Sequence, residues 1–339
     1  MKCKVKLTSL LRVERKVDDV LRLFEKLAKH YPYVWEIGFS GGKDSTTVCS
    51  LVLEYLDLAV RRNLPIPSRI YFLYIDTLVE PPILRDCSLN ILSSLRQYIE
   101  VHFPRNFIDV RIIKPIIGED YFSMIIEKGY PCPNWRFRWC MDRLKIRPLK
   151  RLIHSTGKCA MITGVRKSES ISRKRNMIAR GQKRRISQLR GNLIVAPIFN
   201  WTDEEVWNYL ANSKFRWSKD AYSLLRRIYE CSGANQGVRY GCWVCTVVRR
   251  DRMLEGLSKI DSRYRLLLHA KEKLRDICYN ENYRLKKSDG AYTRLNNAGK
   301  RGVIKILYEV YKKFPEALSG YLTNSKLRDR LMEWIASTC

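Results

Sequence analysis

One stretch of the chain combines the side chains and the spacing that bind phosphate. A short apolar run with β-strand character ends at the sequence SGGKDS (40–45), and a helical pattern begins at Thr46. Glycines let backbone N–H groups turn toward a ligand, and a helix N-terminus adds unpaired donors and a positive dipole end. Lys43 supplies a full charge, and Ser40 and Ser45 supply hydroxyl donors. The stretch is therefore predicted to bind the phosphates of a nucleotide.

Two familiar phosphate loops do not match this sequence. A Walker A loop requires Ser or Thr after the lysine and a glycine five residues before the second glycine. Here Asp44 follows Lys43, and Ile37 occupies the position of that first glycine. The dinucleotide pattern G-x-G-x-x-G is also absent. An ordinary glycine-rich turn is the remaining alternative, and the serines, lysine and aspartate packed around the glycines argue against it.

The elements that must position this loop alternate along the chain. Apolar runs predict strands over 34–39, 69–77, 107–115, 160–165 and 192–198. Helical periodicity covers 17–30, 82–100, 261–276, 296–314 and 325–337, with at most a short helix in 118–129. Strands that alternate with helices predict an α/β fold with a doubly wound, mainly parallel sheet. The sequence TDEE (202–205) predicts a capping box before a further helix.

The predicted organisation has three parts: an N-terminal helical segment over 1–30, a nucleotide-binding domain over 31–212, and a cysteine-containing segment with a helical C-terminal region over 213–339. With 339 residues, one or two domains are expected. No apolar run reaches the roughly 20 residues that span a bilayer. The N-terminal residues lack the apolar core of a signal peptide, so a cytoplasmic protein without a membrane partner is expected.

The charge balance indicates a polyanionic partner. The chain has 64 Lys and Arg residues against 34 Asp and Glu residues, a formal net charge of +30. Nucleic acid is the first candidate. A basic surface that serves solubility or thermal adaptation is the alternative, but such surfaces usually carry matching glutamates. Between Ser170 and Val195 there is no acidic residue, and this stretch is predicted to order on a polyanion, with a solvated loop as the alternative.

Two further strand ends carry polar residues. Asp76 and Thr77 follow the second predicted strand, at the sheet edge where open α/β sheets bind ligands. A cap or turn role is the alternative for Asp76. Gly164 and Arg166 follow the fourth predicted strand, and Arg173 is close behind. This second basic loop is predicted to neutralise phosphate charge.

The eleven cysteines, in a chain expected to be intracellular, argue for metal or redox chemistry rather than a disulfide scaffold. Cys242 and Cys245 form a C-x-x-C pair, which suits an iron–sulfur cluster, a zinc site or a redox dithiol. Cys132 stays open as a further ligand because it lies eight residues before Cys140. Four others are expected to be small buried residues: Cys49, Cys87, Cys159 and Cys278.

Six motifs resemble the phosphoadenosine-phosphosulfate (PAPS) reductase branch of the PP-loop ATP pyrophosphatases. They are SGGKDS (40–45), IDTLVE (75–80), YPCPNWRFRWCMDRLKIRPL (130–149), GVRKSES (164–170), IFNWTDEEVW (198–207) and YGCWVCTVV (240–248). The resemblance covers about residues 15–315. The last motif and the segment 289–310 are most similar to DndC, the ATP pyrophosphatase of DNA phosphorothioation systems.

The resemblance implies a chemistry and a set of partners. PP-loop enzymes split ATP to AMP and pyrophosphate, usually through an adenylylated substrate. DndC-type proteins implant sulfur from a cysteine desulfurase into the DNA backbone and require a [4Fe–4S] cluster. Carried over, the cluster ligands are Cys140, Cys231, Cys242 and Cys245, with zinc as the alternative metal. The chain lacks the adjacent cysteine pair and the C-terminal E-C-G-x-H nucleophile of assimilatory reductases.

The sequence therefore predicts an ATP- and Mg²⁺-dependent sulfurtransferase that acts on double-stranded DNA with a cysteine desulfurase and other phosphorothioation subunits. The predicted catalytic residues are Lys43, Asp44, Arg166 and Arg173. The predicted nucleotide contacts are Ser40, Gly41, Gly42, Lys43, Asp44, Ser45, Asp76, Thr77 and Gly164. The alternatives are a reductase of phosphoadenosine or adenosine phosphosulfate, a tRNA thiolase, and a nucleic-acid-binding subunit that only senses ATP.

Overall fold

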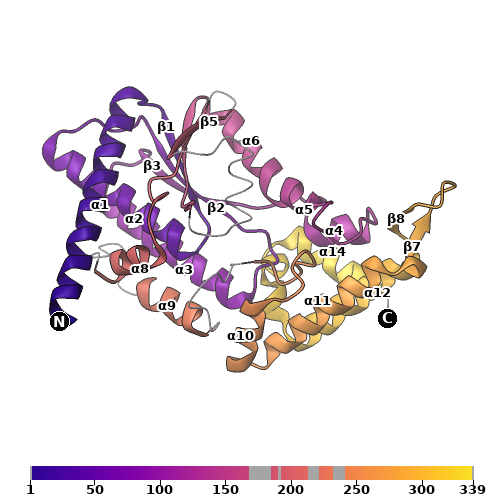
Figure 1. Cartoon of the computed structure of the whole chain (residues 1–339). Helices are drawn as coiled ribbons and strands as arrows, with labels where there is room; N and C mark the ends of the chain where they lie inside the picture. The colour runs from indigo at the N-terminus through magenta and orange to yellow at the C-terminus, as the bar shows by residue number, and fades with distance from the viewer. Residues whose placement is uncertain (1, 168–184, 190–191, 213–220, 232–240, 338–339) are drawn as a thin grey trace. The chain divides into compact units, whose positions relative to one another are not determined.

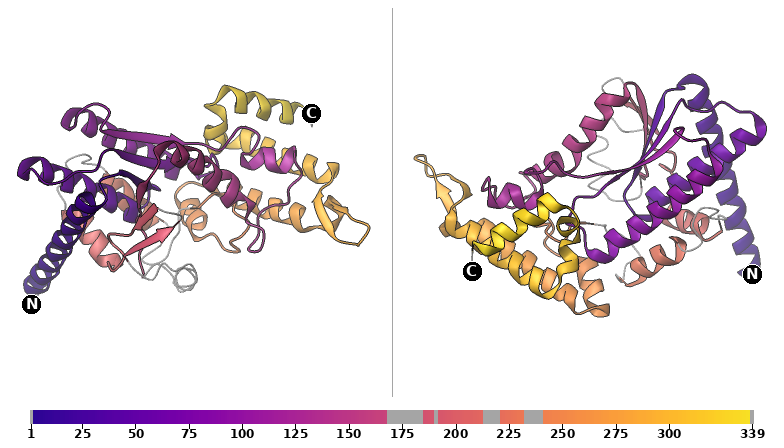
Figure 2. Two further views of the ribbon diagram at one scale, coloured as in Figure 1. Left: turned by 90° about the horizontal axis from the view of Figure 1, so that it is seen from above. Right: turned by 180° about the vertical axis from the view of Figure 1, so that it is seen from behind.

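The computed structural model describes residues 2–167, 185–189, 192–212, 221–231 and 241–337. The chain divides into two compact units, each assembled from three separate stretches (Figures 1 and 2). The first unit comprises Met1–Tyr74, Cys87–Ile112 and Ile153–Arg226. The second unit comprises Ile75–Asp86, Ile113–Leu152 and Arg227–Cys339.

The first unit contains a six-stranded sheet in the order β3-β2-β1-β4-β6-β5 (Figure 1). Its strands are β1 (Val34–Phe39), β2 (Ile70–Ile75), β3 (Ile108–Ile113), β4 (Cys159–Ile162), β5 (Ile186–Leu189) and β6 (Asn192–Val195). β1 pairs in parallel with both β2 and β4, and β4 pairs in parallel with β6. The edge strand β5 pairs with β6 in the antiparallel direction. The predicted mainly parallel α/β fold is therefore confirmed.

Helices pack on this sheet because each presents one apolar face. The helices that belong wholly or partly to the first unit are α1 (Lys2–His30), α2 (Lys43–Arg62), α3 (Pro82–His102), α6 (Arg147–Thr156), α8 (Asp203–Asn212) and α9 (Ala221–Cys231). Phe24 of α1, Trp35 of β1 and Tyr55 of α2 are buried together, with ring centroids 5.5–6.0 Å apart. Burying three aromatic side chains of this size fixes α1 and α2 against β1.

The expected strands and helices all occur, with two differences. The helix after the phosphate loop begins at Lys43, three residues before the expected Thr46, so the charged residues of the loop lie in its first turn. The strand β5 was not predicted. Its residues Ile186 and Gln188 are exposed, and this edge strand therefore lacks an alternating apolar pattern.

The capping box at the start of α8 is confirmed. The Thr202 backbone N–H donates to Glu205 Oε2 at 2.8 Å, and the Glu205 backbone N–H donates to Thr202 Oγ1 at 3.2 Å. Glu205 also accepts an ion pair from Lys16 of α1 at 2.5 Å. The cap therefore fixes the position of Asp203, the first helical residue of α8.

The second unit is mostly helical (Figure 1). It contains α4 (Tyr121–Ile126), α5 (Trp139–Met141), a π-helical turn (Asp142–Ile146), α10 (Arg252–Ile260), α11 (Arg263–Tyr279), α12 (Asn297–Lys313), α13 (Ser319–Leu322), α14 (Ser325–Ala336) and an antiparallel hairpin of β7 (Arg284–Lys286) and β8 (Tyr292–Leu295). α11 packs against both α10 and α12. Phe122, Trp243 and Tyr321 are fully buried and in ring contact at its core. Among the described helices, none is long and apolar enough to cross a membrane.

Candidate active site

The phosphate loop has the backbone geometry that its glycines predict. Gly41 has φ +76°, and a Cβ atom on it would lie 1.8 Å from Ser88 Oγ. Gly42 is the extended residue that precedes the first turn of α2. A residue with a side chain at position 41 would be strained by its φ angle and would also clash with Ser88. The glycine therefore allows the chain to turn tightly between β1 and α2.

The two serines have different positions in this loop. Ser45 is buried, donates its hydroxyl to the Gly42 carbonyl at 2.9 Å, and accepts the Ser40 backbone N–H at 3.1 Å. Ser40 is exposed, and its hydroxyl lies 3.2 Å from that of Ser45. Ser45 thus holds the loop closed, while Ser40 is the hydroxyl that faces solvent.

A second loop contacts the phosphate loop at Gly164. This glycine follows β4, and a Cβ atom on it would lie 2.8 Å from the Asp44 carbonyl carbon and 2.9 Å from the Ser45 nitrogen. Both neighbours are backbone atoms, which cannot move aside as a flexible side chain can. The ends of β1 and β4 are neighbours in the sheet, so this close approach brings the residues after Gly164 beside the start of α2.

Four charged side chains meet there and form what we call the charged cluster: Lys43, Asp44, Arg166 and Asp203. The Arg166 guanidinium lies 2.7 Å from Asp44 Oδ1 and 2.8 Å from Asp203 Oδ1. The Lys43 ammonium lies 3.1 Å from Asp203 Oδ1 and 3.5 Å from Asp44 Oδ2. Arg166 is only 3% exposed. Two cations and two carboxylates thus balance one another at the N-terminus of α2.

The charges in this cluster stabilise one another. Partial burial works against ionisation of Asp203, but Lys43 and Arg166 outweigh it and lower the pKa of that carboxyl. Burial alone would lower the pKa of Arg166, but Asp44 and Asp203 raise it. The carboxylates orient both cations toward the loop, where a phosphate can add contacts without any large rearrangement. Sequence reasoning missed Asp203, although it lies inside the quoted motif IFNWTDEEVW.

The predicted nucleotide contacts Asp76 and Thr77 belong to the second unit. Asp76 is fully buried and receives the guanidinium of Arg85, at 2.8 and 3.1 Å, and the Leu78 backbone N–H. Thr77 is also fully buried, and its hydroxyl donates to Glu80 at 2.5 Å. These contacts commit both side chains to the local fold around α3. The predicted catalytic Arg173 lies outside the described residues, as does the whole basic stretch 168–184.

The cysteine segment is organised around a tight turn. The Cys245 backbone N–H donates to the Cys242 carbonyl at 3.1 Å, and the intervening Trp243 is fully buried. The Cys242 sulfur lies 3.4 Å from the Thr77 hydroxyl. Burial raises the pKa of Cys242 to about 12 and, together with Cys245, raises that of Cys140. Cys140 and Cys242 are therefore thiols at neutral pH in the described protein.

The described residues do not show the predicted cluster site. No three Cys, His, Asp or Glu side chains in the described part of the chain are grouped so that they could hold a metal ion. The predicted ligand Cys231 ends α9, and its side chain lies outside what the structure describes. The fit of a four-cysteine cluster is thus not shown, and no step of the proposed chemistry passes through one.

The expectation that Cys278 is simply a small buried residue is corrected. Cys132 and Cys278 are both buried and form a disulfide, with 5.5 Å between their Cα atoms. The question of Cys132 as a metal ligand is answered for this structure by that bond, because a sulfur in a disulfide is not a thiolate ligand. No local pattern predicts the pairing, since 146 residues separate the two cysteines.

Glu80 is the most unfavourably placed carboxylate of the second unit's motif IDTLVE. Its Oε1 accepts two hydrogen bonds from Thr77, but its buried Oε2 has no hydrogen-bond partner in the structure. Burial and the nearby Asp76 raise its pKa. The folded state therefore holds this proton more tightly than the unfolded chain does, and its stability falls as pH rises above about 4.3, the ordinary value for Glu.

We expect Glu80→Gln to raise the melting temperature at pH 7, because the neutral amide keeps the acceptor for Thr77 and removes the buried charge. A gain of about 1 kcal/mol corresponds to roughly 2–4 °C. Thermal unfolding followed by circular dichroism from pH 4 to pH 8 measures it, and the difference should shrink toward pH 4. Glu272→Gln, at a side chain that is 72% exposed, is the control. A lower melting temperature for Glu80→Gln at pH 7 would contradict this account.

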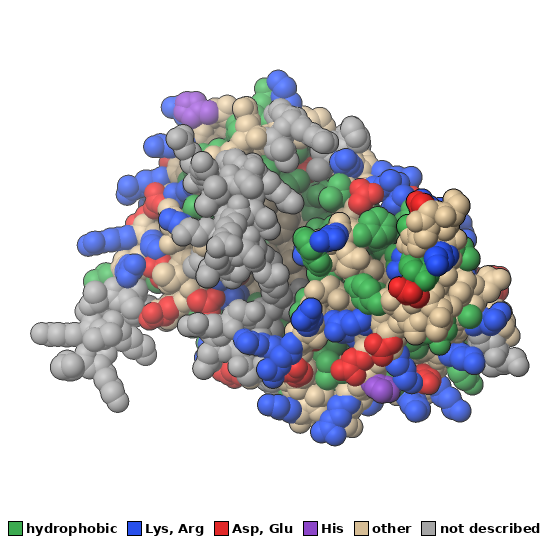
Figure 3. All heavy atoms as spheres, turned by 45° about the vertical axis from the view of Figure 1, so that its right-hand side comes forward, with side chains coloured by type: hydrophobic (Ala, Val, Ile, Leu, Met, Phe, Trp, Pro, Cys, Tyr) green, Lys and Arg blue, Asp and Glu red, His purple; other side chains and the backbone are tan. Residues whose placement is uncertain are grey.

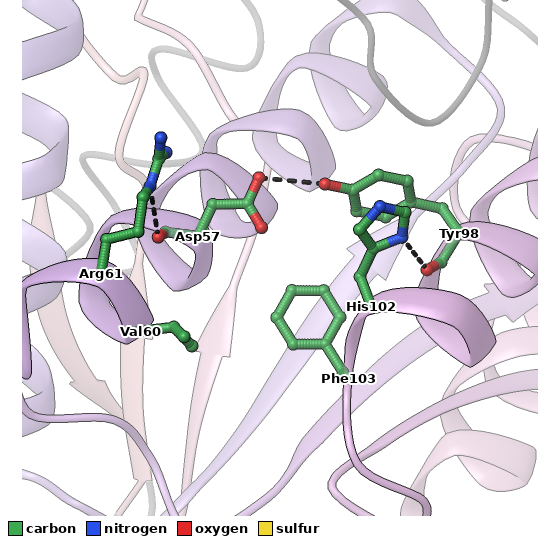
Figure 4. A pocket seen from close by; sticks show the side chains of 6 residues that line it. All are labelled: Asp57, Val60, Arg61, Tyr98, His102 and Phe103. Atoms are coloured by element: carbon green, nitrogen blue, oxygen red, sulfur yellow. Dashed lines mark hydrogen bonds between the residues drawn. The ribbon is translucent and has the colours of Figure 1, made fainter.

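A separate pocket of about 310 Å³ lies between α2 and α3 (Figure 4). It is lined by Asp57, Val60, Arg61, Tyr98, His102 and Phe103. The Tyr98 hydroxyl donates to Asp57 at 2.9 Å, and the His102 ring stacks on Tyr98 (Figure 4). None of the predicted site residues lines this pocket, so it is not the nucleotide site.

The phosphate loop on a mainly parallel sheet, with a basic residue at the neighbouring strand end, defines the class of protein. Residues 36–248, more than half of the chain, match the family model for the phosphoadenosine phosphosulfate reductase domain. The chain belongs to this family, and membership indicates an enzyme of the PP-loop type. The matched range contains both loops and the C-x-x-C pair.

Particular relatives are more distant. The uncharacterized protein MJ0066 of Methanocaldococcus jannaschii is 26% identical over 242 residues, which cover 70% of this chain and 40% of that protein. MJ0973 of the same organism is 20% identical over 199 residues, which cover 59% of this chain and 41% of that protein. The chain thus spans about two fifths of the length of these curated relatives. A PAPS reductase from Candida auris, solved as a phosphate complex, aligns with 13% identity and a TM-score of 0.35 over 59% of this chain and 84% of the other.

Proposed function

We propose that this protein is an ATP pyrophosphatase that activates a nucleic-acid phosphate by adenylylation for sulfur incorporation, with the DNA backbone as its substrate. The observation that carries the first half is the charged cluster beside the glycine turn. Two cations, an uncapped helix N-terminus and a glycine turn lie together, which is the equipment that binds and polarises a triphosphate.

The roles of the residues follow from this arrangement. Backbone N–H groups of Gly41, Gly42 and Lys43 hold phosphate oxygens, and the Ser40 hydroxyl adds a donor. Lys43 and Arg166 neutralise the charge that develops on the departing pyrophosphate. Asp44 and Asp203 orient these cations, and they are also the two carboxylates through which Mg²⁺ would share the phosphates. Magnesium bound there would neutralise the triphosphate further.

The proposed reaction balances in two steps. A non-bridging oxygen of the nucleic-acid phosphodiester attacks the α-phosphorus of ATP, the bond to the β-phosphate oxygen breaks, and pyrophosphate leaves. Hydrosulfide, delivered from a cysteine desulfurase as sulfur donor, then attacks the backbone phosphorus. The bond to the AMP oxygen breaks, AMP departs with the original non-bridging oxygen, and the proton of hydrosulfide passes to solvent. Neither step changes the oxidation state of phosphorus.

The choice of nucleic acid rests on charge. A net charge of +30 exceeds what a small sulfonucleotide requires, whereas it suits a phosphate backbone. Resemblance to DndC favours DNA and further phosphorothioation subunits as partners. Because the chain covers about two fifths of its curated relatives, the activity of any longer assembly is part of the proposal.

The family name itself supports a second candidate, a reductase of adenylylated sulfate. Against it, Cys140 stands between Trp139 and Met141 without an adjacent cysteine. A tRNA thiolase uses the same activation step and differs only in its acceptor.

The iron–sulfur part of the proposal is separate and has its own test. Cys140, Cys242 and Cys245 influence one another electrostatically, and all three influence Tyr121. We propose that these cysteines, with Cys231, hold the [4Fe–4S] cluster, with zinc as the alternative. Iron, sulfide and zinc analysis of anaerobically purified protein, with Cys242→Ser and the control Cys49→Ser, distinguishes the two metals and a metal-free protein.

Pyrophosphate release from ATP by anaerobically purified protein tests the main proposal. Duplex DNA, tRNA and adenylyl sulfate are added in turn with Mg²⁺ present. Stimulation by DNA supports backbone phosphorothioation, whereas stimulation by tRNA alone transfers the function to RNA thiolation. Sulfite release from adenylyl sulfate with a reductant, and no pyrophosphate under any condition, would replace the proposal with the reductase.

A further inference from the structure

A rigid turn in the second unit displays two aromatic side chains to solvent. In residues 134–138, which we call the aromatic turn, Trp135 is 70% exposed and Phe137 is 45% exposed. The Asn134 side-chain oxygen accepts the backbone N–H groups of Arg136 and Phe137, each at 2.8 Å. Because these hydrogen bonds fix the turn, both rings are held outward instead of folding onto the protein.

The turn is supported from beneath by a chain of aromatic contacts. Phe137 packs edge-on against Tyr130, and Tyr130 packs edge-on against Trp139, with centroids 6.0 and 5.8 Å apart. Trp139 is buried and stacks on the buried Tyr121. Its indole N–H donates to the Pro131 carbonyl at 2.8 Å. The exposed rings are therefore anchored to the core of the second unit, and a ligand need not order them.

Basic side chains surround these rings. The Arg136 guanidinium lies 4.7 Å from the centre of the Trp135 ring, and Arg138 is exposed on the other side of Phe137. The segment 284–301, which we call the basic hairpin segment, contains six Lys or Arg residues and one Asp.

The basic hairpin segment lies against the base of the aromatic turn. The Leu295 backbone N–H donates to the Gly129 carbonyl at 2.6 Å, and the Arg294 guanidinium lies 6.0 Å from the centre of the Tyr130 ring. Figure 3 shows lysine and arginine side chains spread widely over the face drawn, with acidic groups fewer and scattered. The exposed rings are therefore set in positive surroundings.

Exposed aromatic rings with flanking cations are the means by which proteins bind single-stranded nucleic acid. Bases stack on the rings, and the cations contact the backbone. A continuous duplex hides the faces of its bases and cannot use such rings. We propose that the aromatic turn and the basic hairpin segment form a binding surface for unpaired nucleotides, on which bases stack against Trp135 and Phe137.

This inference deepens the proposed function, on which it rests for the class of partner. It adds that the nucleic acid is held where its bases are unpaired, as in an opened duplex or a loop. An acidic protein segment is the competing occupant, since tryptophan and arginine are also common at protein interfaces. The positive surroundings and the two unhindered ring faces favour nucleotides, and a polyacid serves as the probe for the competitor.

Fluorescence anisotropy of labelled oligonucleotides, without ATP, tests the proposal. The probes are a 20-nucleotide oligo-dT, an oligo-U of equal length and a blunt 20-base-pair duplex at fixed salt. We expect the single strands to bind more tightly than the duplex, and we expect Trp135→Ala to weaken single-strand binding about tenfold, with Phe137→Ala adding to the loss. Trp135→Phe should restore most of the affinity, because a phenyl ring still stacks. Tyr308→Ala, an exposed aromatic change on α12, is the matched control.

The outcomes are separable. A preference for oligo-dT or oligo-U identifies the source of the unpaired bases, and either supports the surface. Unchanged single-strand affinity in Trp135→Ala and in the double variant, with pyrophosphate release still stimulated by DNA, overturns this surface and leaves the proposed function standing. Equal, Trp135-dependent binding of polyglutamate would replace it with an acidic protein site. No binding of any nucleic acid and no stimulation would overturn both proposals.

Discussion

Replacing Lys43 by methionine is expected to lower the rate of pyrophosphate release by a hundredfold or more. Removing one preorganised charge from a site that stabilises developing negative charge costs about 3–4 kcal/mol. Methionine keeps the aliphatic length of the side chain, which is only 10% exposed, and Arg166 still pairs with both carboxylates of the charged cluster. The chain should therefore stay folded while the chemistry slows. Steady-state rates with saturating ATP and Mg²⁺ measure the effect.

Lys29→Met provides the control, because Lys29 is exposed at the end of α1. Circular dichroism and melting temperature check that both variants fold. A rate within threefold of the wild type for Lys43→Met would contradict the assignment of this lysine to the phosphates. It would leave Lys43 as a structural partner of Asp203.

Replacing Gly164 by alanine is expected to abolish ATP binding while the rest of the chain stays folded. The new methyl group would lie 2.8 Å from the Asp44 backbone, so the two loops must separate. Overpacking of this kind typically costs about 1–3 kcal/mol. Separation of the loops also moves Arg166 away from Asp44 and takes it out of the charged cluster. Calorimetric titration with ATP should show a loss of affinity of more than tenfold.

Gly38→Ala is the matched change in the same unit. The nearest atom to a Cβ on Gly38 is the Ile162 carbonyl oxygen, at 3.8 Å, which is an ordinary contact. We therefore expect Gly38→Ala to bind ATP like the wild type. Equal affinities for Gly164→Ala and Gly38→Ala would show that the close approach of the two loops does not shape the nucleotide site.

The charged cluster also has a pH dependence whose sign is fixed by its geometry. Lys43 and Arg166 lower the pKa of Asp203, so the stabilisation is present above the ordinary carboxyl value and is lost as pH falls through the lowered one. Glu80 has the opposite sign because its pKa is raised. Acid therefore weakens the charged cluster and neutralises the buried charge at Glu80, and the Lys43 and Glu80 variants separate these effects.

The amino-acid sequence by itself determined the features that depend on neighbouring residues. The strand–glycine turn–helix unit at 34–62, the alternation that builds a mainly parallel sheet, and the capping box at Thr202 and Glu205 all arise from spacings of a few residues. Such patterns specify backbone conformation and hydrogen bonds locally, so residue types and spacing are enough to locate the loop and its glycines.

Tertiary structure alone decided which distant side chains meet. Asp203 joins Lys43 across 160 residues because the sheet order places β4 beside β1, and no local pattern contains that order. The Cys132–Cys278 bond and the burial of Asp76 against Arg85 have the same origin. A side chain's spacing states what chemistry it can offer, whereas its partners depend on how separate elements pack, and packing is a property of the whole chain.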